Sequence, residues 1–341
     1  MKVNYSVMMK VALCAMFSAG NGFAATIIVD NNPNHSADYT TLQEAVDAAT
    51  AGDTILIGPS FNGNSYGDAD IKKKLFIYGT GYLLEENNYK GGVSQLGYIT
   101  FWGDFIGLSP NGSIISGVEA NSIDISVQDD EAYVIENISI KRNKIGQVSL
   151  NSSNQELRIK DIIISNNMIT GGAISIGNAI AIINNNIIKT NSTSGTGFVC
   201  FSGEILMFNN SFIYAKASFN PSQMFNGECS GEVYGNIFNE YEKGSSIPVN
   251  IHDNYNGTYT VLEQQVYTWT GSEDSQFQLR ANSLAKGACL NGADCGAFAG
   301  TTPYILSGLP PRPRITNLEL PASVLKTDTT MQVTVSAESR N

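Results

Sequence analysis

A short pattern recurs along the middle of the chain, and it restricts the fold more than any other feature. In each copy an asparagine ends an apolar, alternating segment and is followed two residues later by another residue that is apolar in five of the six copies. The asparagines are Asn143, Asn167, Asn185, Asn210, Asn236 and Asn254, at successive spacings of 24, 18, 25, 26 and 18 residues. Such spacings are typical of the coils of a solenoid with loops of variable length.

The apolar residues within each copy indicate strands. Ile138 and Ile140 alternate with polar residues, as do Ile162 and Ile164 in the next copy, and a period of two is the period of a β-strand. The alternation changes parity at Glu136-Asn137 and Lys160-Asp161, which predicts a corner between two short strands. A helical repeat is the rival interpretation, but β-branched isoleucine dominates and no helical spacing is present. The predicted fold class is all-β, a parallel β-helix.

One short helix is expected near the start. Thr41 stands three residues before Glu44, the spacing of a capping box, and Leu42, Ala45, Val46 and Ala49 share one face. We expect this helix to cover the open end of the first coil, which would otherwise expose its core and strand edges.

The segment from Ile27 to Tyr82 resembles the amino-terminal cap and first coils of pectin lyase-like, right-handed β-helix proteins. The resemblance rests on Asp38-Tyr-Thr-Thr-Leu-Gln-Glu-Ala45, Ala51-Gly-Asp-Thr-Ile55 and Leu75-Phe-Ile-Tyr-Gly-Thr-Gly-Tyr82, and Asp294-Cys-Gly-Ala-Phe298 is similar to the closing turn of such proteins. It implies a right-handed parallel β-helix. It implies no single activity, because the fold hosts lyases, hydrolases, esterases, epimerases and non-catalytic adhesins.

The flanking segments differ from the repeats. Residues 1–24 have the basic start, short apolar core and small residues of a signal peptide, which predicts an exported protein at the cell surface, in the periplasm or outside the cell. The apolar run is too short to span a membrane. Residues 25–300 are assigned to the β-helix, 301–313 to a proline-rich linker, and 314–341 to a short β segment that either packs on the last coil or begins a further module.

Charge and residue counts exclude several functions. The net charge of -11 argues against nucleic acid and anionic membranes as partners. The chain has only two histidines, so we expect no polyhistidine metal site and no cofactor. Calcium is conceivable at Asp129-Asp130, but a solvated turn is the better interpretation. Of the four cysteines after the signal peptide, we expect Cys289 to pair with Cys295 and Cys200 with Cys229 across adjacent coils.

The motifs of the pectin-active enzymes are mostly absent. Of the galacturonan hydrolase motifs only Arg158-Ile159-Lys160 occurs, without its partners, and the two esterase contexts are missing. Two candidate ligand sites remain. The first is a basic cluster of Lys141, Arg142, Lys144, Arg158 and Lys160, which could bind a uronate or sulfate or could simply be solvated.

The second candidate is an outward ladder of Ile183, Phe208 and Tyr234, with His252 on the next copy. Its rings could stack on a sugar chain, or a loop such as Thr190–Gly197 or Ser218–Gly227 could cover them. The repeated asparagines themselves are expected to adopt left-handed backbone angles and to form a buried hydrogen-bonded ladder, with Asn185 inside the ladder and Asn186 outside it.

Two functional hypotheses follow. The first is a secreted or cell-surface β-helix that binds polysaccharide or serves as a structural element without catalysis. The second is a lyase or hydrolase acting on an acidic, uronate-containing polysaccharide.

Overall fold

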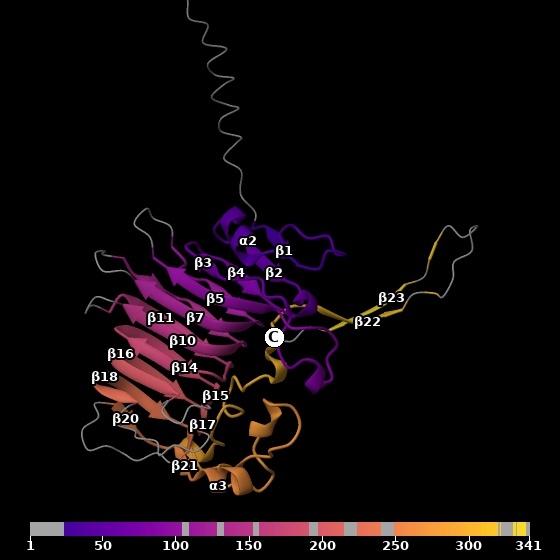
Figure 1. The fold of residues 1–341 in the computed structure, drawn as a ribbon. Helices are drawn as coiled ribbons and strands as arrows, with labels where there is room; N and C mark the ends of the chain where they lie inside the picture. Colours follow the sequence, from indigo (N-terminus) through magenta and orange to yellow (C-terminus); the bar gives the residue numbers. More distant parts are fainter. Residues whose placement is uncertain are drawn as a thin grey trace, which may run out of the picture.

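The computed structural model describes residues 24–103, 109–127, 133–152, 157–190, 197–214, 224–239, 249–319, 321, 330–331 and 333–338. The chain forms a parallel β-solenoid of about 7 turns, and the strands stack in sequence order from the indigo end to the orange end in Figure 1. The predicted all-β, parallel fold class is confirmed. The right-handed sense of the coil stays a prediction, and the signal peptide lies outside the described residues.

The parallel strands form three series, and each coil passes through them in turn. The first series ends at the repeated asparagines. It comprises β1 (Thr26–Val29), β2 (Thr54–Ile57), β4 (Phe76–Tyr78), β6 (Ile114–Ser116), β9 (Ser139–Lys141), β11 (Ile159–Ser165), β14 (Ala179–Asn184), the ends of β16 (Phe198–Phe208) and β18 (Phe225–Tyr234), and β20 (Val249–Ile251).

The second series begins directly after the asparagines. It comprises the starts of β5 (Gln95–Trp102), β7 (Glu119–Val127) and β10 (Lys144–Ser152), followed by β12 (Met168–Ile169), β15 (Ile187–Thr190), β17 (Ser211–Tyr214), β19 (Ile237–Asn239) and β21 (Tyr255–Gly257). The third comprises β3 (Ala69–Ile71), the ends of β5, β7 and β10, β13 (Ile174–Gly177) and the starts of β16 and β18.

The corners lie where the alternation changes parity. Asn137 and Asp161 have left-handed backbone angles, with φ of 60° and 53°, and β8 (Ile135–Glu136) pairs with the start of β11 just before this corner. On both sides of the corner the predicted inward isoleucines, such as Ile135 before Asn137 and Ile138 after it, are fully buried. The predicted corners are therefore confirmed.

The helix α2 (Leu42–Ala48) begins after Thr41, whose side-chain oxygen accepts a hydrogen bond from the backbone N–H of Glu44. Leu42, Ala45 and Val46 are buried in the main core, and α2 lies beside β1 at one end of the solenoid (Figure 1). That α2 caps the first coil stays a prediction.

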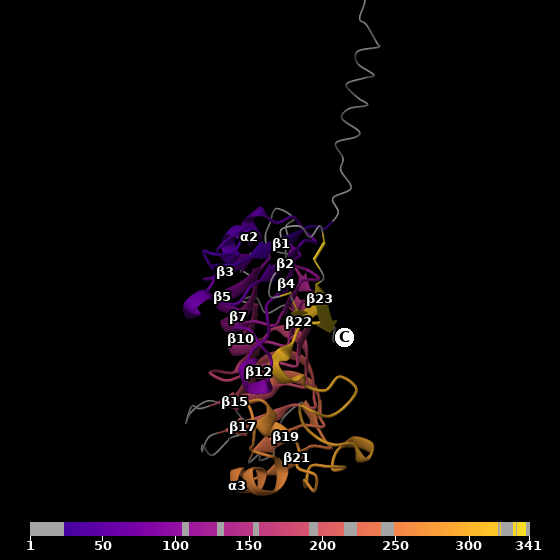
Figure 2. The ribbon, with the colours of Figure 1, turned by 90° about the vertical axis from the view of Figure 1, so that its right-hand side faces the viewer.

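After β21 the chain turns back on the solenoid. It forms α3 (Tyr259–Val261) and a short π-helical turn over Leu262–Val266, and Leu262, Tyr267 and Phe277 then pack against outward side chains of the second series, including Ile187 and Ile237, in a second apolar core. Figure 2 shows this orange segment beside the lower strands of the second series and the yellow continuation rising toward the indigo end.

The carboxy-terminal hairpin pairs β22 (Arg314–Glu319) with β23 (Thr334–Glu338) in antiparallel fashion. It extends away from the solenoid in Figure 1. Within the described residues, no helix has the length and apolar character that crossing a membrane requires.

Candidate functional site

The predicted asparagine ladder is present, and it contains Asn186 instead of Asn185. From the second member onward, the side-chain oxygen of each member accepts hydrogen bonds from both the backbone N–H and the side-chain amide of the preceding member, at 2.8 to 3.2 Å. The members are Asn143, Asn167, Asn186, Asn210, Asn236 and Asn254. The ladder spacing across this coil is therefore 19 residues and then 24.

The assignment of Asn185 was wrong because three consecutive asparagines, Asn184 to Asn186, offer the same side chain at three positions. Isoleucines occupy both the even positions 180 and 182 and the odd position 183 of this strand, so the alternation of apolar residues does not decide which positions face inward. Strand pairing does decide it: Ile183 lies opposite Met207, and Asn184 lies opposite Phe208. Ile183 is fully buried, so its predicted outward position is also wrong.

The left-handed backbone belongs to the residue before each ladder asparagine, and not to the ladder asparagine itself as predicted. Positive φ angles occur at Arg142, Asn166, Asn185, Asn209, Gly235 and Asp253. Each turn therefore uses two adjacent residues, one that reverses the chain and one that bonds to the next coil.

These turn residues are covered by residues 295–310, which we call the return segment. It runs across the turns in the opposite order to the coils. The backbone N–H of Gly296 donates to the carbonyl of Gly235. The side-chain amide of Asn185 donates to the carbonyls of Ala297 and Ala299, and the side-chain amide of Asn166 donates to the carbonyl of Thr302. The guanidinium of Arg142 donates to the carbonyl of Leu309. Tyr304, Ser307 and Leu309 are buried, so part of the expected linker 301–313 packs on the solenoid.

A buried polar cluster fastens the return segment to the first coils. The hydroxyls of Tyr82 and Tyr304 form a hydrogen bond of 2.5 Å. The carboxylate of Asp274 accepts hydrogen bonds from the side chains of Ser272 and Asn87 and from the backbone N–H of Ser307. Burial raises the pKa of both tyrosines well above the usual value, so they remain neutral donors and acceptors.

The five residues of the basic cluster lie on different elements of two successive coils. Arg142 is in a turn under the return segment, and burial lowers its pKa. Lys141 ends β9, and burial followed by the charge of Arg142 lowers the pKa of its ammonium. Lys144 begins β10 and lies 3.4 Å from the carboxylate of Glu119.

The other two basic residues lie beyond a corner of the coil. Arg158 immediately precedes β11, and Lys160 lies in β11 before the corner at Asp161, opposite Glu136 of β8. Lys141 lies opposite Ser165, which follows that corner. The chain thus distributes these charges over a turn, a strand and a corner. A single anion-binding patch formed by all five residues stays a prediction.

The aromatic ladder is real but its ring faces cover one another. Phe208 and Tyr234 stack with centroids 5.5 Å apart and planes at 7°, and Tyr234 stacks on His252 at 5.6 Å and 18°. A sugar needs an open ring face to stack on, and the faces between these rings are occupied. The two loops proposed as covers lie largely outside the described residues, at 191–196 and 215–223.

His252 ends this stack and is held between two carboxylates. Its Nδ1 is 2.7 Å from Asp253 and its Nε2 is 3.1 Å from Glu232. The hydrogen bond with Asp253, reinforced by Glu232, raises the pKa of the imidazole above 6.5. Both ring nitrogens are occupied by carboxylates, which suits a structural imidazolium better than a catalytic base.

A groove of about 620 Å³ crosses three coils where the second series bends into the third. The bend is tight at Gly146, where an added Cβ would lie 2.3 Å from the carbonyl oxygen of Asn121, and at Gly97, where it would lie 1.9 Å from the carboxylate of Asp68. The groove is lined mainly by polar side chains: Ser65, Gln95, Tyr98, Glu119, Asn121, Lys144 and Thr170.

Strand register places these side chains in rows along the groove. Gln95, Glu119 and Lys144 lie on successive coils in one row. Tyr98 flanks that row, and its side chain is 56% exposed. Of this set only Lys144 was singled out from the sequence, because isolated polar residues on outward strand positions carry no periodic signal.

The remaining predictions concern metals and disulfides. No group of histidine, cysteine and carboxylate residues suited to a metal occurs among the described residues, which exclude Asp129-Asp130. Both predicted disulfides are confirmed: Cys200–Cys229 joins adjacent coils and Cys289–Cys295 closes a short turn. Disulfides are typical of an oxidising compartment.

Comparison with protein-family models, with curated proteins and with solved structures yields no match for this chain.

Proposed function

We propose that this protein is an exported, non-catalytic polysaccharide-binding β-solenoid, and that the groove over β5, β7 and β10 is its binding site. The observation that carries the proposal is an open groove that combines an exposed aromatic ring with hydrogen-bonding side chains from three coils. Saccharide ligands require such a combination, because their hydroxyls need paired donors and acceptors and their C–H faces need an apolar partner.

A non-catalytic role suits the groove better than a lyase or hydrolase role. A uronate lyase needs an unpaired basic group beside the substrate, whereas Lys144 lies 3.4 Å from Glu119 and 3.9 Å from Glu273. On β7, burial raises the pKa of Asp124, and the single hydroxyl of Ser122 lies 2.8 Å from both oxygens of its carboxylate and donates to them. The carboxyl is therefore already hydrogen-bonded within β7, which does not suit a general acid.

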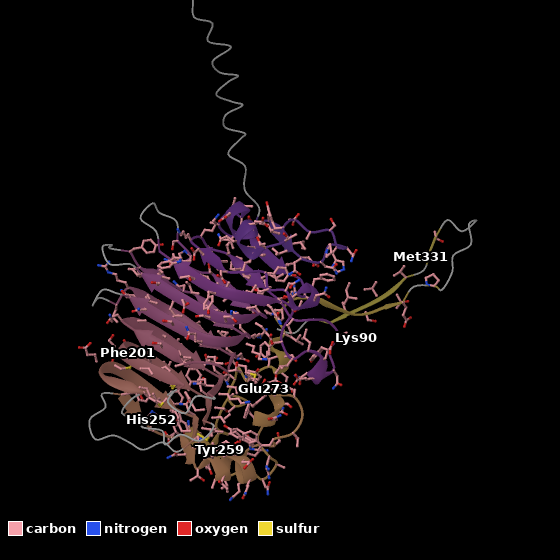
Figure 3. All side chains as sticks on the ribbon, viewed as in Figure 1. Lys90, Phe201, His252, Tyr259, Glu273 and Met331 are labelled. Atoms are coloured by element: carbon pink, nitrogen blue, oxygen red, sulfur yellow. A yellow bond between two sulfur atoms is a disulfide. The ribbon has the colours of Figure 1, made fainter. Side chains whose placement is uncertain are left out.

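The test is binding of the purified protein, from residue 25 onward, to a panel of soluble polysaccharides by affinity electrophoresis and calorimetry. Tyr98→Ala should weaken binding about tenfold, since removing a stacking ring costs about 1.4 kcal/mol. Phe201→Ala is the matched control. Phe201 is 52% exposed and lies on the side of the solenoid away from Glu273 (Figure 3), so its loss should leave binding unchanged.

Product formation separates the two hypotheses. We expect neither unsaturated-uronate absorbance nor new reducing ends after prolonged incubation. Either signal, abolished by a change in the groove, would replace the binding role with a lyase or a hydrolase.

A further inference from the structure

We infer that the groove selects an electrically neutral glycan, and that the glycan chain lies along the solenoid axis across successive coils. The inference rests on the proposed function and names its ligand class. It departs from the uronate ligand that the basic cluster suggested, and it is carried by the charges, the hydrogen-bonding groups and the register of the groove.

The charges of the groove leave no cation to recognise an acid. Lys144 is the basic residue in its lining, and its ammonium has two carboxylates as neighbours, Glu119 at 3.4 Å and Glu273 at 3.9 Å. Glu273 is shared with Lys189, at 3.0 Å. The whole chain carries a net charge of -11. A polyuronate would therefore approach like charge and would have to compete for an ammonium that is already paired.

The uncharged groups of the groove match sugar hydroxyls. Gln95 and Asn121 each present an amide donor and an amide acceptor, and Thr170 presents a hydroxyl that can do both, whereas the Ser65 hydroxyl donates to the carbonyl of Gln95 and accepts from the N–H of Gly67. A sugar hydroxyl also donates and accepts, so these groups pair with it without a change in protonation. Recognition of a carboxylate depends instead on charged, preferably bidentate, donors, which this lining lacks apart from Lys144.

The register fixes the direction of the ligand. Gln95, Glu119 and Lys144 are paired on adjacent strands, and adjacent strands are about 4.8 Å apart. The polar row therefore runs perpendicular to the strands and parallel to the solenoid axis. A glycan in the groove would meet an equivalent position on each coil, with the ring of Tyr98 beside it.

The experiment compares neutral and acidic probes at two salt concentrations. We expect at least one of dextran, mannan and xyloglucan to bind with an affinity that changes less than twofold between low and high salt, and polygalacturonate and alginate not to bind. Binding of polygalacturonate or alginate that weakens with salt would overturn the inference while leaving the proposed function intact. Failure of all five probes to bind would overturn the proposed function itself, and the inference with it.

Variants sharpen the comparison. Asn121→Leu should lower neutral-glycan affinity at least fivefold, whereas Asn151→Leu, an exposed amide at the other end of β10, should not change it. Glu119→Gln removes one of the two carboxylates beside Lys144 and should produce measurable, salt-sensitive polygalacturonate binding. If Glu119→Gln gains no such binding while Asn121→Leu and Asn151→Leu lose neutral-glycan affinity equally, charge and position do not determine the ligand, and the inference is wrong.

Discussion

At each ladder turn, two neighbouring residues have separate physical tasks. Asn185 adopts a left-handed backbone, with φ of 54°, and its amide bonds to the return segment. Asn186 has its oxygen bonded to Asn167 and its amide bonded to Asn210 and to the carbonyl of Ile164. Asparagine suits both tasks, since it tolerates the left-handed region and carries both a donor and an acceptor.

Replacing Asn186 should therefore destabilise the solenoid strongly. Asn186→Leu leaves the backbone N–H of Asn167, the carbonyl of Ile164 and the side-chain oxygen of Asn210 with fewer partners in a buried site, and we expect a loss of about 2–4 kcal/mol. Asn151→Leu, at an exposed position, should change stability by less than about 0.5 kcal/mol. Urea unfolding measures both, and equal midpoints would contradict the ladder.

At the scale of the elements, what could be predicted depended on whether the signal was local. Alternation and the Asn137 and Asp161 corners are local patterns, and they predicted strands that the structure contains. The ladder was assigned correctly in five of six coils and failed where Asn184 to Asn186 made the register ambiguous. The return segment was not predicted, because its bonds to the turns join residues far apart in sequence, such as the side-chain amide of Asn185 and the carbonyl of Ala297, and the backbone carbonyls that accept these bonds leave no mark in a sequence.

The pairing of β18 with β20 carries an electrostatic contribution that depends on pH. His252 stacks on Tyr234 and contacts Asp253 and Glu232, which raise its pKa above 6.5 in the folded protein. Because the pKa of His252 is higher in the folded than in the unfolded protein, its protonated imidazole stabilises the folded state. This contribution is complete below the pKa of the unfolded state and is lost as the pH rises through the pKa of the folded state.

His252→Phe keeps a ring for the stack on Tyr234 and removes the charge. We expect wild type to be more stable than this variant at pH 5, with the difference in Tm shrinking as the pH rises from 6.5 through the raised pKa. Thermal melts of both proteins from pH 5 to 9 measure this. A difference that stays constant with pH, or grows with it, would show that the imidazolium contributes nothing here.

For the whole molecule, the extent of the cooperative unit follows from where apolar side chains are buried. The main core runs through the solenoid, and the second core joins the second series to Leu262, Phe277 and Tyr304. The groove includes the core residues Leu96, Ala120 and Ile145, but its polar side chains belong to neither core. These polar side chains could not be identified from the sequence, because core packing imposes no repeating pattern on them.

The hairpin of β22 and β23 should fold and unfold independently of that unit. Ile315, Val335 and Met331 are 63%, 54% and 52% exposed, and Figure 3 shows Met331 far from the solenoid. A hairpin of two strands is only marginally stable in water by itself. Deleting residues 314–341 should therefore shift the Tm of the solenoid by no more than about 2 °C, and amides of β22 and β23 should exchange with solvent much faster than those of β9 and β11.

Deleting from Tyr304 onward is the matched control. It removes the buried residues Tyr304 and Leu309, which are 4% and 5% exposed. Because the Tyr304 hydroxyl is also the partner of the Tyr82 hydroxyl, this deletion should lower the Tm by more than about 5 °C. Equal effects of the two deletions would place the boundary of the cooperative unit within the hairpin and contradict its independence.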